Sequence, residues 1–300
     1  MAERVVFHVD ANSAFLSWSA AYRVQVLGES LDLRTVPSVV AGDRESRRGI
    51  ILAKSTPAKK YGIQTGEPLF KALEKCPDLV VIPPDYSLYV QASRSFVEIL
   101  RQFSPIVEQY SIDEAWVDMT GTERLWGSPL LAAEKMRNKI NEELGFTVNI
   151  GISSNKLLAK MAGDFEKPNK IHTLFPEEME SKFWPLPIRD LFLVGAATEK
   201  KLKTLGIYTI GQLATADVRV LKKRLGKHGE TIWHFATGRN AEMVTPEPAE
   251  NKGYGNSITT AQDVTNHQEG YQVLLSLCET VGMRMRKDGQ CGSCVSIHLR

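Results

Sequence analysis

Three acidic residues could do chemistry together in this chain. Asp113 and Glu114 are adjacent within the run YSIDEAWVDMTG, and Asp10 follows the apolar run VVFHV near the start of the sequence. Adjacent carboxylates repel one another, and burial without a partner would cost both a large desolvation energy. Their place in an apolar, aromatic stretch therefore predicts that a cation lies beside them.

The chemistry open to such acids depends on the cation. Ligand sets made of oxygen alone are typical of hard ions such as Mg²⁺, which keep bound waters and recruit substrate phosphates. Two ions about 3.5–4 Å apart can hold the attacking and leaving oxygens of an in-line phosphoryl or nucleotidyl transfer. On spacing alone, ordinary surface acids are an equal alternative, so the fold must decide.

The elements that must position these acids alternate in type. A nearly continuous apolar run predicts a central strand over 5–9. The spacing of hydrophobic residues and the presence of helix-capping residues predict further helices and strands. These are helices over 13–26, 67–75, 86–105, 128–145 and 155–167, strands over 106–120 and 146–154, and a small α/β insert over 36–83. The order predicts an α+β layer with helices on one face of a sheet. A single strand would send the side chains of Asp113 and Glu114 to opposite faces of the sheet. A turn or bulge at the end of the strand is therefore needed to bring both acids to Asp10.

Composition sets wider limits. The 300 residues are 43% hydrophobic, which suffices for a real core and suggests two or more domains, and a net charge of +2 says little about nucleic acid. We find no signal peptide and no uninterrupted apolar span, so a cytoplasmic protein that does not enter membranes is expected. Cys76, Cys278, Cys291 and Cys294 form no disulfide framework, and the CxxC pair lacks further metal ligands, so reduced thiols are preferred.

Four segments carry a family resemblance. HVDANSAF, YSIDEA, NIGISSNKLLAKMAGDFEKPNK and LKTLGIYTIGQLA occur in this order, and at these intervals, in the Y-family DNA polymerases, the translesion enzymes. The chain resembles the bacterial DNA polymerase IV or polymerase V catalytic-subunit (UmuC-like) type over nearly its whole length. The resemblance implies an α+β right-hand polymerase with an α/β palm, a small fingers insert, a helical thumb and the start of an α/β little finger.

The domain boundaries expected from this resemblance are as follows. The palm covers 1–12 and 84–174, the fingers 13–83, the thumb 175–241 with a helix-hairpin-helix, a linker 242–252 and a partial little finger 253–300. The last segment should contain a helix and a strand over 294–300. Because the family's little finger normally runs about twice as far, we expect the chain to be a fragment.

The resemblance also assigns the acids. Asp10 and Asp113 match the aspartates that hold both metal ions, Glu114 matches the glutamate at the primer-side metal, and the Ala11 carbonyl matches a backbone ligand. Two Mg²⁺ ions are implied, for which Mn²⁺ can substitute. Phe15 matches the steric gate under the incoming sugar, where a ring excludes a 2′-OH. Ser13 and Ala14 flank it and suit a roomy site. Without metal, repulsion should raise the pKa of Asp113 or Glu114.

Phosphate and DNA contacts are implied at further positions. Lys167 matches the lysine that reaches the triphosphate, whereas Lys59 and Thr56 stand where many members carry arginine and tyrosine, so the grip there is looser. In the hairpin Leu193 replaces the first glycine and Gly195 retains the second. DNA phosphates are expected at the residues Gly195, Thr198, Lys200, Lys223 and Lys227, the last two lying in the basic run LKKRLGKHG.

The implied function is template-directed addition of dNTPs to a primer 3′-OH opposite damaged or undamaged template, in damage tolerance. The implied partners are primer-template DNA and dNTP, with a monomeric enzyme and a sliding clamp bound through a C-terminal segment beyond this sequence. One alternative is a catalytically weak DNA-binding paralogue that acts as a scaffold, which the departures at Lys59, Thr56 and Leu193 favour. A cyclase-like enzyme is a further alternative, against which the hairpin and the basic run argue.

Overall fold

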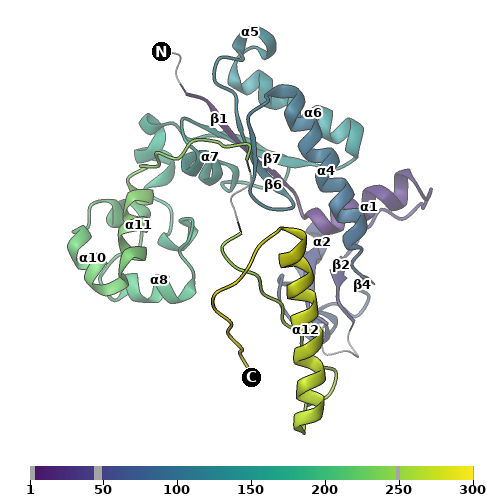
Figure 1. Cartoon of the computed structure of the whole chain (residues 1–300). Helices are drawn as coiled ribbons and strands as arrows, with labels where there is room; N and C mark the ends of the chain where they lie inside the picture. The colour runs from purple at the N-terminus through teal and green to yellow at the C-terminus, as the bar shows by residue number, and fades with distance from the viewer. Residues whose placement is uncertain (1–3, 44–48, 248–250, 300) are drawn as a thin grey trace. The chain divides into compact units, whose positions relative to one another are not determined.

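The computed structural model describes residues 4–43, 49–247 and 251–299, which form two compact units (Figure 1). The first unit comprises Met1–Thr35 and Asp85–Pro248, and the second comprises Val36–Pro84 and Ala249–Arg300. The predicted mixed architecture is confirmed, because a sheet with packed helices lies beside a group of short helices within the first unit.

The first unit is built on a sheet in the order β5-β6-β1-β7-β8. The strands are β1 (Val6–Ala11), β5 (Val107–Gln109), β6 (Glu114–Asp118), β7 (Val148–Ser153) and β8 (Ile171–Thr173). β1 is central and pairs antiparallel with both β6 and β7, which explains why its sequence is apolar nearly throughout. Asp10 therefore lies near the C-terminal end of the central strand, with paired strands on both sides.

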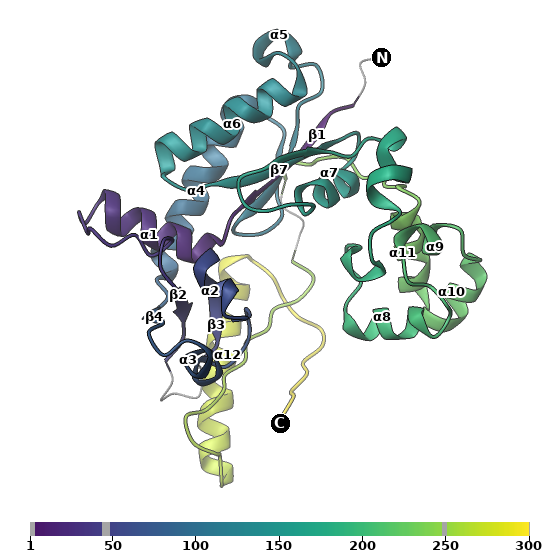
Figure 2. The same cartoon turned by 180° about the vertical axis from the view of Figure 1, so that it is seen from behind.

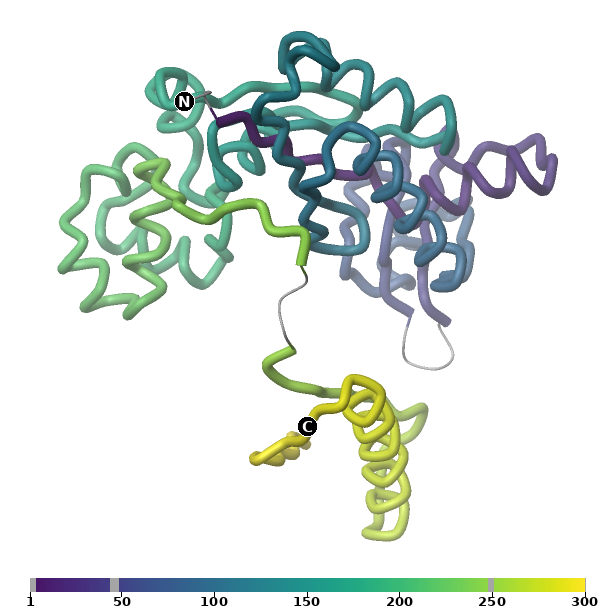
Figure 3. Tube along the Cα trace, turned by 45° about the horizontal axis from the view of Figure 1, so that its top comes forward, coloured from purple at the N-terminus to yellow at the C-terminus, as the bar shows by residue number. Residues whose placement is uncertain are grey.

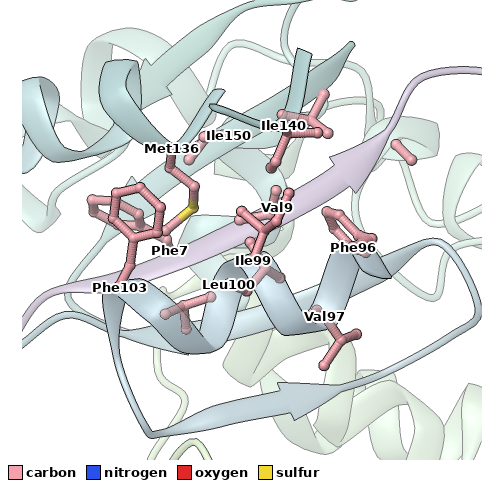
Figure 4. Packing of buried hydrophobic residues seen from close by; sticks show 14 of the residues in the cluster. Phe7, Val9, Phe96, Val97, Ile99, Leu100, Phe103, Met136, Ile140 and Ile150 are labelled. Atoms are coloured by element: carbon pink, nitrogen blue, oxygen red, sulfur yellow. The ribbon is translucent and has the colours of Figure 1, made fainter. Parts of the chain in front are cut away.

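Two long helices cover one face of this sheet. The helices of this part are α1 (Ala14–Gln25), α4 (Tyr86–Phe103), α5 (Glu123–Trp126) and α6 (Pro129–Leu144). Phe7 and Val9 point from β1 into a core where they meet apolar residues of α4 and α6 (Figure 4). As predicted, Ser128 caps α6, because its side chain accepts a hydrogen bond from the backbone N–H of Leu131, and Pro129 is the first residue of the helix.

The opposite face of the sheet is covered by α7 (Lys156–Gly163), so the prediction of helices on one face was wrong. The close approach requires Gly151 on β7, because a Cβ there would lie 1.9 Å from the carbonyl oxygen of Ala159. α7 also ends earlier than the predicted residue 167. The residues after Gly163 form the loop that carries Lys167.

The run 106–120 is a hairpin rather than the single predicted strand. β5 and β6 pair antiparallel, with Val107 opposite Val117, and bends over 111–113 join them. The turn that the convergence of the acids required therefore exists, immediately before Glu114. Its consequence is that Asp113 lies in the turn and Glu114 at the first position of β6.

Short helices form the rest of the first unit. They are the 3₁₀ turns Pro176–Glu178 and Ile188–Asp190, a π turn Met179–Phe183, and α8 (Ala196–Lys203), α9 (Ile210–Ala214), α10 (Val218–Leu225) and α11 (Lys227–Ala236). Their core includes Leu202 and Leu221 and reaches Leu158 of α7. After α11 the chain runs back over the sheet (Figure 3), where Val244 is buried against Val6 and Trp116.

The start of the expected linker is thus packed rather than free. The backbone N–H of Thr245 donates to the Glu108 carboxylate at 2.9 Å, and Arg4 donates to the Glu242 carbonyl at 2.9 Å. Residues 248–250 of that linker lie outside the described part. The helix α1, which was expected with the fingers, packs with α4 in the first unit. The functional boundaries of the domains stay predictions.

The second unit contains a separate sheet in the order β3-β2-β4, drawn with its helices in Figure 2. Its elements are β2 (Ser38–Ala41), β3 (Ile51–Lys54), α2 (Thr56–Lys60), α3 (Leu69–Lys75), β4 (Val80–Ile82) and, after the linker, α12 (His267–Lys287). The small α/β insert predicted over 36–83 is therefore present. The strand predicted over 294–300 is not formed in 294–299, and Arg300 lies outside the described residues.

None of the helices in the described ranges combines the length and apolar character that crossing a bilayer requires.

Candidate active site

The three predicted acids meet at one end of the palm-like sheet. Asp10 lies directly opposite Glu114 in the antiparallel pairing of β1 and β6. Residues opposite one another in such a pair project from the same face, which here is the face covered by α7. Asp113 is held beside them, because its carbonyl accepts a hydrogen bond of 2.9 Å from the N–H of Ala11. The pairing of β1 with β6 thus brings Asp10 beside two acids that lie 103 and 104 positions later in the sequence.

Glu114 is bound to two basic side chains. His8 Nε2 lies 2.9 Å from Glu114 Oε2, and the Lys160 ammonium donates to the same oxygen. All three groups are shielded, with 1%, 13% and 11% of the His8, Glu114 and Lys160 side chains exposed. Although burial opposes ionisation, the hydrogen bonds from His8 and Lys160 lower the pKa of Glu114 to about 2. The expectation that repulsion raises a pKa is therefore wrong for Glu114.

Asp10 has a cation of its own. Lys167 Nζ lies 3.2 Å from Asp10 Oδ1 and 2.9 Å from Asp164 Oδ1. Burial raises the pKa of Asp10, the nearby charge of Lys167 opposes that rise, and Asp113 adds to it. Burial tends to lower the pKa of Lys167, but Asp10 and Asp164 raise it above its ordinary value. The cation predicted beside the acids is thus supplied, in the chain itself, by two lysines.

The acids have the donor chemistry for a hard cation. Asp113 lies close enough for its charge to help raise the pKa of Asp10. Carboxylate and carbonyl oxygens are the ligands that Mg²⁺ prefers. Among the described residues, however, no three His, Cys, Asp or Glu side chains are arranged to hold a metal ion. The reason is visible at Glu114, whose carboxylate is turned to Lys160 and His8. The residue types at this end of the sheet nevertheless fit a divalent metal ion.

A buried amide fixes the loop that carries Lys167. Asn149 lies opposite Asp10 on β7 and is fully buried. Its Nδ2 donates to the carbonyls of Gly163 at 3.0 Å and Glu166 at 2.6 Å, and its Oδ1 accepts from Asn12 at 3.1 Å. These bonds tie both ends of the turn between α7 and Lys167 to the sheet. The position of the Lys167 ammonium is therefore set by the core.

Phe15 lies in an aromatic cluster at the start of α1. Its ring stacks on Tyr89 with centroids 4.5 Å apart and 12° between planes, and Tyr86 meets it edge-on at 6.2 Å. Ser13 precedes the helix in a left-handed conformation with φ of 49°, and Ala14 is buried. A ring packed in this way has little rotational freedom.

The two nucleotide contacts predicted from the fingers lie in the second unit. Thr56 begins α2 and Lys59 follows within it, both with exposed side chains. Ser55 caps this helix by accepting a hydrogen bond from the N–H of Ala58 at 3.1 Å. Burial lowers the pKa of Lys54, and the nearby charge of Lys59 adds to that effect. Two ammonium groups therefore gather where the sequence suggested one.

The thumb hairpin contains a backbone conformation that favours glycine. Leu193, which replaces the family's first hairpin glycine, has φ of 69° and is 47% exposed. L-residues with large side chains rarely adopt this region. Gly195 follows as the N-cap of α8, which carries Thr198 and Lys200. Leu193 therefore adopts a backbone conformation that glycine would adopt without strain.

The second basic run forms another helix-turn-helix, with Gly226 at φ of 65° between α10 and α11. Thr198 Oγ1 lies 3.5 Å from His228 Nε2, so the predicted DNA contacts of α8 and of Lys227 lie close together. In the described residues Lys200, Lys223 and Lys227 make no ion pair, whereas Lys203 pairs with Glu199 and Lys222 with Glu230. Exposed lysines without partners keep their charge available for phosphate.

Sequence reasoning missed three residues of this site. His8 could have been found, because position i−2 of a strand shares the face of Asp10. Lys160 carried a weaker signal, since only the placement of α7 on the acid face brings it to Glu114. Asn149 carried none beyond being an amide in a buried strand.

Comparisons with known proteins agree with this geometry. The impB/mucB/samB family matches residues 9–164, its C-terminal domain matches 251–300, and the thumb domain of DNA polymerase-iota matches 189–240. A DNA polymerase IV of Clostridium acetobutylicum is 45% identical over 99% of this chain and 74% of its own length. A DNA polymerase IV of Clostridium kluyveri is 41% identical over 99% of this chain and 73% of its own length.

Among solved structures, a Y-family polymerase chimera of Dbh and Dpo4 superposes with a TM-score of 0.78 at 24% identity, covering 94% of this chain and 80% of that chain. That likeness shows the fold. The family model covers more than half of the sequence, and the curated relatives match it nearly from end to end. The chain therefore belongs to the impB/mucB/samB family of Y-family DNA polymerases.

Proposed function

We propose that Asp10, Asp113 and Glu114 are the catalytic acids with which this chain adds dNTPs to a primer 3′-OH. Membership of the family makes the chain a DNA-directed DNA polymerase of the translesion type. The observation that carries the site assignment is the pairing of Asp10 with Glu114 at the sheet's end, with Asp113 held to Ala11 beside them.

The acids would hold divalent metal. Two Mg²⁺ ions, or Mn²⁺ in their place, stabilise the charge on the attacking and leaving oxygens in chemistry of this kind. Asp10 and Asp113 are the ligands proposed for both ions. The Ala11 carbonyl is proposed as a backbone ligand, and Glu114 as the ligand of the primer-side ion. Since burial raises the pKa of Asp10, a cation beside it also keeps that carboxylate ionised.

Residues of the first unit beside these acids would hold the substrate. Lys167 is one-third exposed and lies between Asp10 and Asp164, so its ammonium can pass to a triphosphate oxygen. We propose Lys59 and Thr56 as weaker contacts to the same group. The Phe15 ring, packed on Tyr89, would lie under the sugar and exclude a 2′-OH, while the small side chains of Ser13 and Ala14 leave room beside it.

DNA would be held by its backbone. Gly195 is the N-cap of α8, Thr198 lies in its first turn and Lys200 in its last turn. Lys223 and Lys227 lie on either side of the turn at Gly226. Exposed ammonium groups and helix starts bind phosphates regardless of sequence. We also propose that the enzyme acts as a monomer on primer-template DNA in the cytoplasm, and that a clamp contact lies beyond this sequence.

The test is primer extension with Mg²⁺ on an undamaged and an abasic template. We expect Asp113→Asn to lose about 10³-fold or more in rate, a loss of the size seen when a group that stabilises transition-state charge is removed. Glu123→Gln, which neutralises an exposed acid on α5 away from the site, is the matched control and should extend normally. Extension retained in Asp113→Asn contradicts the assignment. An unmodified protein that binds DNA but does not extend the primer favours the scaffold alternative.

A further inference from the structure

The Lys160 side chain sits between the catalytic acids and the thumb. Its ammonium donates to Glu114 Oε2, and it lies 5.3 Å from the ring centroid of Tyr110 and 5.3 Å from that of Phe192. Tyr110 belongs to the hairpin that carries the acids, whereas Phe192 belongs to the thumb. One cation therefore touches a predicted metal ligand and two aromatic faces from different parts of the first unit.

The aromatic groups form a continuous contact. The rings of Tyr110 and Phe192 meet edge-on with centroids 6.3 Å apart, and Phe192 stacks on Phe235 of α11 at 6.0 Å. Phe192 directly precedes Leu193, the residue with positive φ in the thumb hairpin. A change in the conformation of the thumb hairpin would therefore first move the Phe192 ring, which faces the Lys160 ammonium.

The Lys160 ammonium occupies the carboxylate that a metal ion would need if Glu114 is a ligand. Glu114 Oε2 already accepts from His8 and Lys160. Loss of the Lys160 ammonium without a replacement would leave a shielded charge unpaired, which is costly. Cation–π contacts strengthen as the cation is desolvated, so the two rings favour the lysine's present position.

We propose that Lys160 is a positioning residue that holds Glu114 away from the metal site until a metal ion displaces its ammonium group, and that the thumb sets the strength of this hold through Phe192. This inference rests on the proposed function, because it takes Glu114 as a metal ligand. It also links the thumb to the acids. If the thumb hairpin moves when it binds DNA, the contact between the Phe192 ring and Lys160 would weaken, and metal binding at Glu114 would be favoured.

The chain supplies a matched control on the same helix. Lys156, one turn before Lys160, donates to Glu108 at 2.7 and 2.9 Å and lies 4.5 Å from the Trp116 ring centroid. It therefore has the same kind of ion pair and the same kind of aromatic contact, but its acid is not one of the three at the site. Lys156→Met removes a buried lysine without touching Glu114.

The experiment is Mn²⁺ binding to the full chain without DNA or nucleotide, followed by electron paramagnetic resonance. We expect Lys160→Met to bind Mn²⁺ about tenfold more tightly, since it leaves a shielded carboxylate without its cation. Lys160→Arg and Lys156→Met should stay within about twofold of the unmodified chain, because each keeps a cation on Glu114.

A second variant tests the thumb without changing any charge. Phe192→Leu removes one aromatic face from Lys160 and should tighten Mn²⁺ binding about threefold. Tyr208→Leu, at an exposed thumb position, should leave it unchanged. Equal or weaker binding by Lys160→Met than by the unmodified chain overturns the proposal while leaving the metal site intact. Absence of Mn²⁺ binding in every variant overturns the proposed metal site. It also overturns the proposed role of Lys160, which depends on that site.

Discussion

The palm and the thumb of this chain treat charge in opposite ways. At the palm, Asp10 and Glu114 are shielded and each is paired with a lysine, Lys167 and Lys160. On the thumb, Lys223 and Lys227 are exposed and make no ion pair in the described residues. A site for chemistry needs charges fixed in place, whereas a grip on a DNA backbone needs charges that are free to follow phosphates.

The largest effect is expected when a charge of the palm is removed. Glu114→Gln leaves the Lys160 ammonium shielded and unpaired, so we expect the metal-free chain to lose about 2–3 kcal/mol of unfolding free energy at pH 7. Urea denaturation measures this loss. A loss below about 0.5 kcal/mol, the size of an exposed pair, would remove the distinction between the two regions.

The pH dependence of that loss follows from the sign of the shift. Because the pKa of Glu114 falls from 4.5 to about 2 in the folded chain, its contribution is fully present above pH 4.5. It is lost as pH falls from 4.5 through about 2. The difference between the unmodified chain and Glu114→Gln should therefore be constant from pH 7 to 4.5 and shrink below that. A difference that grows on acidification would contradict the pairing with Lys160.

A second palm charge should affect substrate binding. Lys167→Met removes the ammonium proposed for the triphosphate, and we expect KM for dNTP to rise about tenfold with primer-template affinity unchanged. Lys170→Met is the control, because Lys170 is more exposed and pairs with Glu166 at 3.4 Å. Steady-state extension measures both. Equal effects of the two substitutions would mean that position in the loop is unimportant.

A substitution in the thumb should increase the stability of the folded chain. Leu193→Gly places glycine at a φ of 69° and should stabilise the chain by about 0.5–1 kcal/mol, after the extra freedom of glycine in the unfolded chain is subtracted. Val220→Gly, at an exposed position within α10, should instead destabilise by about 0.3–0.5 kcal/mol, the difference between the helix propensities of valine and glycine. Thermal unfolding distinguishes these signs. Destabilisation by Leu193→Gly would show that its side chain matters more than its backbone.

The smallest expected effect concerns a single thumb charge. Lys223→Ala should weaken binding to any DNA sequence a few-fold and reduce the slope of log affinity against log salt by about 1. Its neighbour Lys222 already pairs with Glu230 at 2.9 Å, so Lys222→Ala should change the slope less. Fluorescence anisotropy at several salt concentrations measures both slopes. A larger change for Lys222 would contradict the importance of unpaired lysines.

Much of the architecture could be predicted from the sequence because the signals were local. The apolar run of β1, the Ser128–Pro129 start of α6 and the acids themselves each depend on a few neighbouring residues. The hairpin within 106–120 was missed because its turn, residues 111–113, lies in a run whose apolar residues continue on both sides. Its acids look like strand residues until the pairing with β1 is known.

The cations of the site were harder to predict, because they depend on which face of the sheet each helix covers. The prediction placed all helices on one face, which would separate Lys160 from Glu114. In the structure Gly151 allows α7 to pack on the other face, and the lysine reaches the acid. A cation beside the acids was expected, but that it is carried by the chain itself followed only from the fold.

One measurement tests the central claim most directly. Crystals of the chain with Mn²⁺, primer-template DNA and a dNTP can be examined by anomalous diffraction. We predict manganese peaks at ligand distance from Asp10 and Asp113, with Glu114 turned to the metal and Lys160 Nζ no longer bonded to it. Manganese bound elsewhere, with Glu114 still paired to Lys160, would contradict the account.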